Sequence, residues 1–152
     1  MQAWRIAKER YALDRAGTGS QRTGGRWNSQ GVAVIYAGLT PGVCALEKLV
    51  HTSDHLIADL VLVSIQLPDE ESLYKKYLPS DLPKGWSAVP SSTASIEFGD
   101  KFVAEQKYLG IILPSAVMPE EFNLLINPGH PAYHLVSYKI ERPFTFDERL
   151  RG

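Results

Sequence analysis

The chain has 152 residues, a length that suits one domain and can bury a sizeable core without disulfide bonds. It carries 16 Lys and Arg against 17 Asp and Glu, and the formal net charge of −1 excludes the basic surplus typical of bulk nucleic-acid binding and the acidic surplus of a disordered tail. The 44% hydrophobic and 22% charged fractions are typical of a globular protein. We therefore predict one domain over residues 1–152.

Cellular location is indicated by cysteine content and by the N-terminus. Cys44 is the single cysteine of the sequence, so no intramolecular disulfide can form, which favours a reducing compartment. The first residues lack the apolar segment of a signal peptide, and the longest apolar runs are only as long as strands. We expect a cytoplasmic protein that binds neither membrane nor nucleic acid directly.

The first half of the chain predicts two strands around a polar loop, and then a helix. A short strand is expected at residues 4–7 and a buried, β-branched strand at residues 32–37. The glycine-rich residues 17–31 between them are expected to form a loop. Thr40 and Pro41 suit the N-cap and first helical position of a helix that runs to about His51 or Ser53.

The second half predicts more strands than helices. Strands are expected at residues 59–67, 110–113, 122–126 and 133–140, with a short helix at 70–77, a proline-rich loop at 78–91 and a helix at 92–108. Gly99 weakens the middle of that last helix. Because strands and helices do not alternate regularly, we predict an α+β fold rather than a doubly wound sheet.

The first candidate site is the run Gly24-Gly25-Arg26-Trp27-Asn28. Glycines expose backbone N–H groups, and a guanidinium can hold a phosphate or carboxylate through two parallel hydrogen bonds. Trp27 can stack on a planar ring. The alternative is a surface turn with a solvated arginine. The run matches neither the phosphate loop of nucleotide hydrolases nor the glycine spacing of a Rossmann turn.

The second candidate is Glu47, which lies at the margin of the apolar face of the predicted helix, near Val43 and Val50. A carboxylate placed there must be paired, hydrogen-bonded or shifted in pKa. Arg26 or Arg5 would be its natural partner. The alternative is a glutamate that reaches the rim or makes an ion pair for stability only.

Three further residues have a structural interpretation beside the functional one. His51 follows Glu47 by one turn, but no third metal ligand lies at motif spacing, so a helix-end position favoured by the dipole is preferred. Ser115 follows a strand end without the GxSxG motif of serine hydrolases, and capping a turn is the stronger interpretation from the residues alone. Tyr36 ends a buried strand, where core packing is common.

Taken in order, these segments resemble the RES domain family, which is named for an Arg, a Glu and a Ser. The resemblance covers nearly the whole chain. It runs through Trp4-Arg5-Ile6, Gly24-Gly25-Arg26-Trp27-Asn28, Gly31, Val34-Ile35-Tyr36, Ala45-Leu46-Glu47-Lys48-Leu49-Val50-His51, Trp86, Gly99-Asp100, Pro114-Ser115-Ala116-Val117, Asn123-x-x-x-Asn127-Pro128-x-His130-Pro131 and Phe146-Asp147-x-Arg149-Leu150. The ordered set is far more specific than any one segment.

The resemblance implies a compact α+β domain like the ADP-ribosyltransferase toxins, with a cleft for NAD⁺. It implies the toxin of a bacterial type II toxin–antitoxin pair, which degrades NAD⁺ by breaking its nicotinamide–ribose bond through hydrolysis or phosphorolysis. The implied partner is an antitoxin with an Xre-like helix-turn-helix and a C-terminal part that blocks the cleft, in a hetero-oligomer. NAD⁺ is the substrate, and no metal or other cofactor is expected, because NAD⁺ already carries its leaving group.

The family Arg, Glu and Ser fall on Arg26, Glu47 and Ser115, and Tyr36 matches a tyrosine of the same cleft. Arg26 would hold the pyrophosphate, Glu47 would stabilise positive charge on the ribose, and Tyr36 would stack on the nicotinamide. Ser115 would bind the nicotinamide amide or position the other groups.

Secondary contacts to NAD⁺ are expected from Trp27, Asn28 and Arg5. Two other functions remain open: mono-ADP-ribosylation of a cellular protein by the same cleft, and a non-enzymatic module that binds a nucleotide or a peptide.

Overall fold

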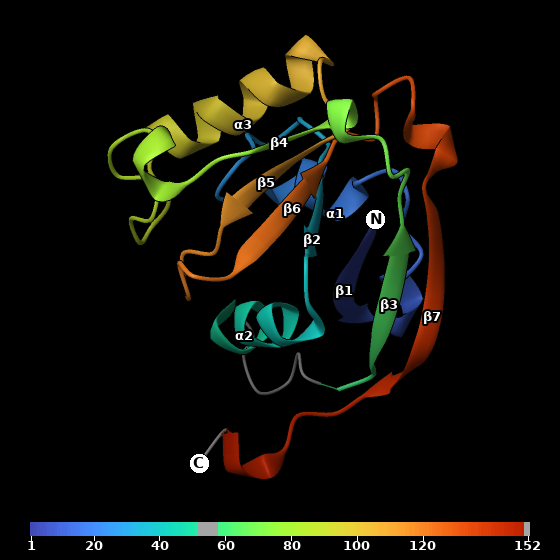
Figure 1. The fold of residues 1–152 in the computed structure, drawn as a ribbon. Coiled ribbons are helices and arrows are strands. Elements are labelled where there is room, and N and C mark those ends of the chain that lie inside the picture. The colour runs from blue at the N-terminus through green and yellow to red at the C-terminus, as the bar shows by residue number, and fades with distance from the viewer. Residues whose placement is uncertain (52–57, 151–152) are drawn as a thin grey trace.

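The structure is a computed structural model that describes residues 1–51 and 58–150. Within these residues the strands form a seven-stranded sheet in the order β4-β5-β6-β2-β1-β3-β7 (Figure 1). The strands are β1 (Gln2–Lys8), β2 (Ile35–Gly38), β3 (Leu60–Gln66), β4 (Tyr74–Lys76), β5 (Gly110–Pro114), β6 (Phe122–Ile126) and β7 (Ser137–Phe144). The helices are α1 (Thr18–Thr23), α2 (Pro41–His51) and α3 (Thr93–Glu105).

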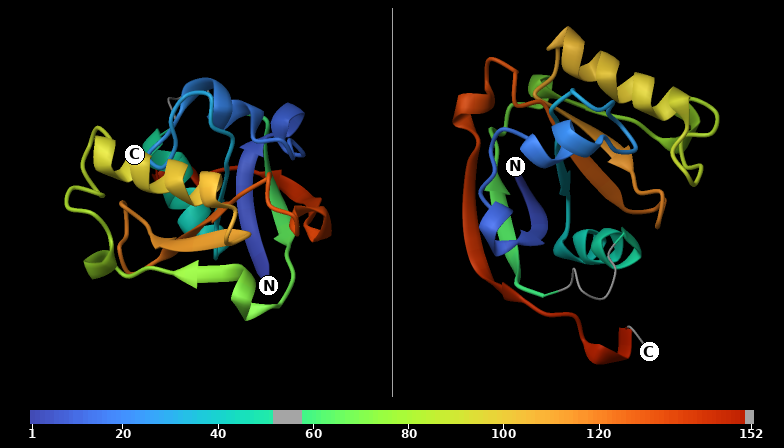
Figure 2. Two further views of the ribbon diagram at one scale, coloured as in Figure 1. Left: turned by 90° about the horizontal axis from the view of Figure 1, so that it is seen from above. Right: turned by 180° about the vertical axis from the view of Figure 1, so that it is seen from behind.

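The sheet is mostly antiparallel. Each neighbouring pair of strands runs antiparallel except β4 and β5, which are parallel. In Figure 1, α3 lies along β4 and β5, while α2 lies below the sheet near the ends of β1 and β2. The view from behind in Figure 2 shows α1 in front of the strands, on the far side of the molecule in Figure 1. This arrangement confirms the predicted α+β class.

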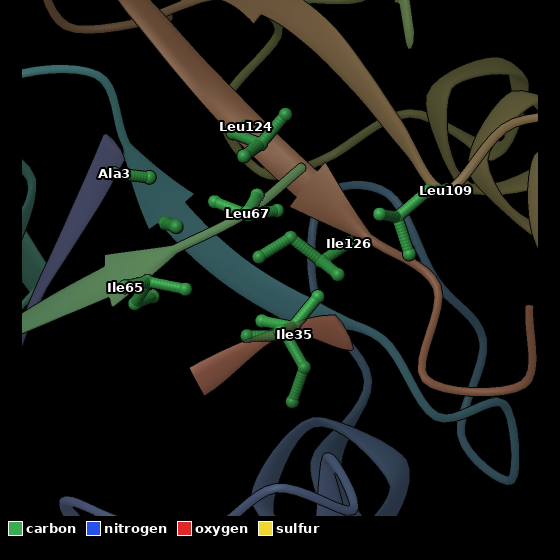
Figure 3. Close-up of a cluster of buried hydrophobic side chains, with 9 residues drawn as sticks. Ala3, Ile35, Ile65, Leu67, Leu109, Leu124 and Ile126 are labelled. Carbon is green, nitrogen blue, oxygen red and sulfur yellow. The ribbon is translucent and has the colours of Figure 1, made fainter. Parts of the chain in front are cut away.

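The largest buried cluster packs residues of β1, β2, β3 and β6 with residues that adjoin strands β3, β5 and β7 (Figure 3). Its members are apolar residues with at most 7% of their surface exposed: Ala3, Ile35, Ala37, Ile65, Leu67, Leu109, Leu124, Ile126 and Val136. The register sets this packing, since Ala3 pairs with Ile65 and Ile35 pairs with Ile126 across the ladder. None of the helices among the described residues is long and apolar enough to cross a membrane.

Helix α2 begins as its sequence predicts. The backbone N–H of Val43 donates to the Thr40 hydroxyl at 3.2 Å, which caps the first turn, and Pro41 is the first helical residue. The helix packs Cys44 and Leu49 against Ile6 of β1 and neighbouring strand residues. The helix reaches His51, and the alternative end at Ser53 lies outside the described residues.

Three predicted elements are wrong in part, and one was missed. The strand expected at residues 32–37 begins only at Ile35, as β2. Residues 70–77 form a single 3₁₀ turn, Glu71–Leu73, and then strand β4, because pairing with β5 overrides the local helical pattern. Residues 133–140 begin with the 3₁₀ turn Tyr133–Leu135 and only then enter β7. Helix α1 lies inside the segment predicted to be a loop, since glycine content conceals a short polar helix.

Gly99 has a packing reason for its place in the middle of α3. A Cβ atom built at this position would lie 1.7 Å from the carbonyl oxygen of Trp27 and 2.5 Å from its carbonyl carbon. The helix therefore rests directly on the backbone of the Arg26–Trp27 turn, and only glycine permits that approach. Asp100, the next residue, fixes the following turn by accepting from the backbone N–H of Ser29 at 2.8 Å.

We predict that Gly99→Ala lowers the free energy of unfolding by at least about 2 kcal/mol, because the new methyl group overlaps backbone atoms that cannot rotate away. Urea unfolding followed by circular dichroism measures this change. Gly19→Ala is the matched control, since nothing lies within 4 Å of its Cβ position. The control should leave stability unchanged or raise it by up to about 1 kcal/mol. Equal effects of the two substitutions would contradict the packing role of Gly99.

Candidate active site

A cavity of about 490 Å³ lies between α2, the strands β1, β2, β5 and β6, and the turn at residues 24–28. Its lining combines aromatic, cationic and carboxylate groups: Trp4, Arg5, Ile6, Gly25, Arg26, Trp27, Tyr36, Ala37, Gly38, Cys44, Glu47, Lys48, His51, Ser91, Pro114, Ala116, Asn123 and Leu125. Arg26, Tyr36 and Glu47, which come from a turn, a strand and a helix, share this cleft as the sequence analysis predicts.

The carboxylate of Glu47 is held from two segments of the chain. Its Oε1 atom accepts a hydrogen bond from the Ser115 hydroxyl at 2.6 Å and another from the Asn123 side-chain amide at 2.8 Å. Its Oε2 atom lies 3.5 Å from His51 Nε2, one helical turn away. The side chain retains 26% of its surface exposed, so a fixed carboxylate remains open to the cleft.

Ser115 is fully buried in the turn that joins β5 to β6. Its hydroxyl oxygen accepts from the backbone N–H groups of Val117 at 3.1 Å and Met118 at 3.2 Å, while its proton goes to Glu47. A hydroxyl committed in this way is not poised as a nucleophile. Ser115 therefore caps the turn, as its residue pattern predicts, and also positions the Glu47 carboxylate, as the family resemblance implies.

Arg26 is anchored while part of its guanidinium stays available. Its Nη1 atom donates to the carbonyl oxygens of Trp86 at 2.9 Å and Ala88 at 2.8 Å. Nε and Nη2 donate to no other group within the described part of the chain, and the residue lines the cleft. The donors that remain are suited to an anion held by two parallel hydrogen bonds.

Tyr36 is fixed by its hydroxyl group and lines the cleft. The hydroxyl donates to Asn28 Oδ1 at 2.5 Å and accepts from the backbone N–H of Trp27 at 3.1 Å, while burial raises the pKa of the phenol to about 12. A Cβ on Gly25 would lie 2.6 Å from this hydroxyl, so glycine is needed where the turn crosses the tyrosine. The phenol therefore stays protonated, with its position set by the turn.

Trp27 and Asn28 both have structural roles, and their predicted contacts with a ligand stay predictions. Trp27 is 3% exposed and packs between Trp86, at a ring-centroid distance of 6.4 Å, and Phe98, at 5.8 Å. Asn28 is 1% exposed, and its amide donates to backbone carbonyls at 2.9 Å on either side of the loop, including that of Ser20. Trp27 nevertheless lines the cleft, whereas Asn28 does not.

Arg5 corrects one expectation, the ion pair with Glu47, while it lines the cleft as a predicted contact for NAD⁺. Its Nη1 atom donates to the carbonyl of Asp14 at 3.2 Å, Nη2 donates to the carbonyl of Ala12, and the guanidinium lies 5.2 Å from the ring centre of Tyr138. Burial lowers its pKa. The group is thus committed to the loop after β1, and neither Arg5 nor Arg26 forms the predicted ion pair with Glu47.

Asn123 is the site residue that sequence reasoning missed. It lies in β6, and it was part of the Asn123-x-x-x-Asn127 spacing that carried the family resemblance. Only the pairing of β6 with β2 and β5 brings its amide to Glu47. Within residues 1–51 and 58–150, no three His, Cys, Asp or Glu side chains gather as a metal site would require.

The fold and the site together define an α+β protein with a cleft in which a positioned carboxylate and an anchored guanidinium lie among aromatic side chains. Comparison with known proteins identifies the class further. The model of the RES domain matches residues 2–147, so the chain belongs to the RES domain family.

Similar proteins agree with this assignment. The chain is 39% identical to the "Prs ADP-ribosylating toxin" of a Sphingobium strain, over 97% of this chain and 94% of that protein. It is 32% identical to "Toxin Res" of Yersinia enterocolitica, over 99% of this chain and all of that protein. Its fold resembles a chain of the Mycobacterium tuberculosis MbcT–MbcA toxin–antitoxin complex, with a TM-score of 0.69 and 18% identity over 95% of this chain and 84% of that one. The protein is a RES-domain protein of the toxin type.

The reactivity of Cys44 tests whether the thiol is buried beside the cleft as the structure describes. Burial raises the pKa of its thiol from an ordinary value of 9.0 to about 12. The folded protein therefore keeps a proton that the unfolded chain loses between pH 9 and 12, so this thiol makes the fold less stable as pH rises through that range. We expect iodoacetamide alkylation, followed by mass spectrometry, to titrate near pH 12 in native protein and near its ordinary value in urea. Rapid alkylation of native protein at pH 9 would contradict this.

Proposed function

We propose that this protein is the toxin of a toxin–antitoxin pair and that its cleft cleaves the nicotinamide–ribose bond of NAD⁺. The observation that carries the proposal is the carboxylate of Glu47, which Ser115 and Asn123 hold in a cleft shared with Arg26. Cleavage of that bond sends its electron pair to nicotinamide and leaves positive charge on the ribose. A fixed carboxylate stabilises such charge without reorganisation.

The role proposed for each remaining side chain follows from the part of it that is not already committed to a hydrogen bond. Arg26 presents Nε and Nη2 to the cleft, which suits the pyrophosphate of NAD⁺. Tyr36 has a committed hydroxyl, so its ring is the part that can stack on the nicotinamide. Ser115 acts through Glu47 and is a positioning residue. The acceptor oxygen, from water or from inorganic phosphate, then bonds to the ribose carbon and completes hydrolysis or phosphorolysis.

Transfer of ADP-ribose to a protein is the second candidate. It is favoured by the 39% identical relative, whose name describes an ADP-ribosylating toxin. The same carboxylate and guanidinium serve both reactions, which differ only in the acceptor. Incubation of the protein with labelled NAD⁺ and cell lysate distinguishes them, because transfer gives a labelled protein band and hydrolysis gives free ADP-ribose.

A partner antitoxin is part of the proposal. It is supported by the toxin–antitoxin complex in which the similar fold occurs, and the partner proposed is a protein with an Xre-like helix-turn-helix. The reaction needs cellular NAD⁺, which implies action in the cytoplasm. Copurification with the product of the adjoining gene tests the partnership.

Glu47→Gln should reduce nicotinamide release by at least about 100-fold, because the amide keeps the shape and removes the negative charge. Chromatography of NAD⁺ and its products, with and without phosphate, measures the change. Glu97→Gln is the matched control, since Glu97 is exposed on α3 and does not line the cleft. Thermal unfolding should be similar for both variants. Release at the parent rate by folded Glu47→Gln protein would overturn the proposal.

Arg26→Lys should raise the KM for NAD⁺ at least about tenfold, because an ammonium group cannot supply two parallel hydrogen bonds or hold the Trp86 and Ala88 carbonyls as the guanidinium does. Initial rates at varied NAD⁺ measure the effect. Arg22→Lys, in the exposed part of α1, is the control. An unchanged KM in Arg26→Lys would remove Arg26 from the phosphate role.

A further inference from the structure

One cationic group of the cleft has no role in the reaction described above. Lys48 lines the cavity next to Glu47 in the chain, on the side of α2 that faces β1. It follows Cys44 by one helical turn, and the Cys44 thiol donates to the carbonyl of Trp4 at 3.2 Å. Trp4 and Ile6 of β1 line the same cavity. Lys48 is therefore a half-buried cation on the β1 wall.

The charge of Lys48 is not balanced by the cleft's own carboxylate. Glu47 directs its carboxylate to Ser115 and Asn123, on the β5–β6 side, and no ion pair joins it to Lys48. Within the described part of the chain, no carboxylate lies within salt-bridge distance of Lys48. Lys8, which shares a face of β1 with Trp4 and Ile6, adds a like charge that acts on Lys48, but Lys8 itself lines a separate hollow with Glu9, Arg10 and Asp59.

A half-buried ammonium group beside a second ammonium group is in an unfavourable place when the cleft is empty. Burial lowers the pKa of Lys48, and the like charge of Lys8 lowers it further. A bound anion would relieve both effects at once, since it replaces lost hydration and offsets the repulsion between the lysines. The lysine thus has the character of a ligand group rather than of a solvated surface charge.

Lys48 and Arg26 act on different walls of the cleft. Arg26 is anchored to the carbonyls of the segment after residue 85, whereas Lys48 belongs to α2 and adjoins β1. Arg26 and Lys48, on separate walls of a cleft with a single carboxylate, indicate a ligand, or a pair of ligands, with more than one anionic group.

We propose that Lys48 forms a second anion subsite of the cleft that takes a phosphate group. The inference rests on the proposed function. The phosphate has two possible sources: the pyrophosphate of NAD⁺ itself, or inorganic phosphate that accepts ADP-ribose. In the first case Arg26 and Lys48 hold the two phosphates of the pyrophosphate between them, and in the second Arg26 holds the pyrophosphate while Lys48 holds the inorganic phosphate.

The test begins with binding, which needs no turnover. Calorimetric titration with inorganic pyrophosphate and with inorganic phosphate, at low ionic strength, compares the parent protein with Lys48→Met, Lys48→Arg and Lys101→Met. Methionine keeps the length of the side chain and removes its charge. Lys101, exposed on α3 and away from the cleft, is the control. We expect Lys48→Met to weaken anion binding about tenfold, while Lys48→Arg and Lys101→Met bind as the parent does.

Kinetics then identify the source of the phosphate. A raised KM for NAD⁺ with unchanged dependence on phosphate assigns the subsite to the dinucleotide. A raised KM for phosphate with an unchanged KM for NAD⁺ assigns it to the acceptor. If folded Lys48→Met protein binds anions and turns over NAD⁺ as the parent does, the proposed subsite is refuted. Lys48 would then contribute only through the packing of its aliphatic side chain. Absence of nicotinamide release from the parent would refute the proposed function, while the titrations would still decide the role of Lys48.

Discussion

The geometry of the cleft depends on the two hydrogen bonds that Glu47 Oε1 accepts from Ser115 and Asn123. They join α2 to the β5–β6 turn and to β6, which are more than 60 residues away in the chain. A glutamate on a helix has several accessible rotamers, and two donors from a rigid sheet select one of them. The carboxylate is thus held in place before any ligand arrives.

Close backbone contacts shape the turn at residues 24–28, which forms another wall of the cleft. Gly25 lets the turn cross the Tyr36 hydroxyl, and Gly99 lets α3 rest on the backbone of Trp27. The buried ring of Trp27 fills the interior of this loop, and the Asn28 amide hydrogen-bonds to its backbone carbonyls. Arg26 is left pointing outward from the loop. The rigid loop matters because an arginine has high conformational entropy, and anchoring it in advance reduces the cost of binding an anion.

Structural and chemical roles alternate along the same short motif. In Gly24-Gly25-Arg26-Trp27-Asn28, Arg26 offers unpaired guanidinium donors to the cleft, and the residues beside it shape and support the turn. The same holds in α2, where Cys44 packs and bonds to β1 while Glu47 and Lys48 face the cavity. A family pattern therefore marks residues that build the cleft as readily as residues that would act in it.

The sequence by itself determined the α+β class, the start of α2, most strands, and a set of cleft residues that includes Arg26, Tyr36 and Glu47. These depend on local chemistry: β-branched runs, the Thr40–Pro41 cap, and the ordered family motifs. Only the tertiary structure decided that residues 74–76 pair as a strand, that Arg5 serves a loop, and that Asn123 reaches Glu47. Such outcomes come from strand pairing and contacts between distant segments, which periodicity and spacing along one chain do not encode.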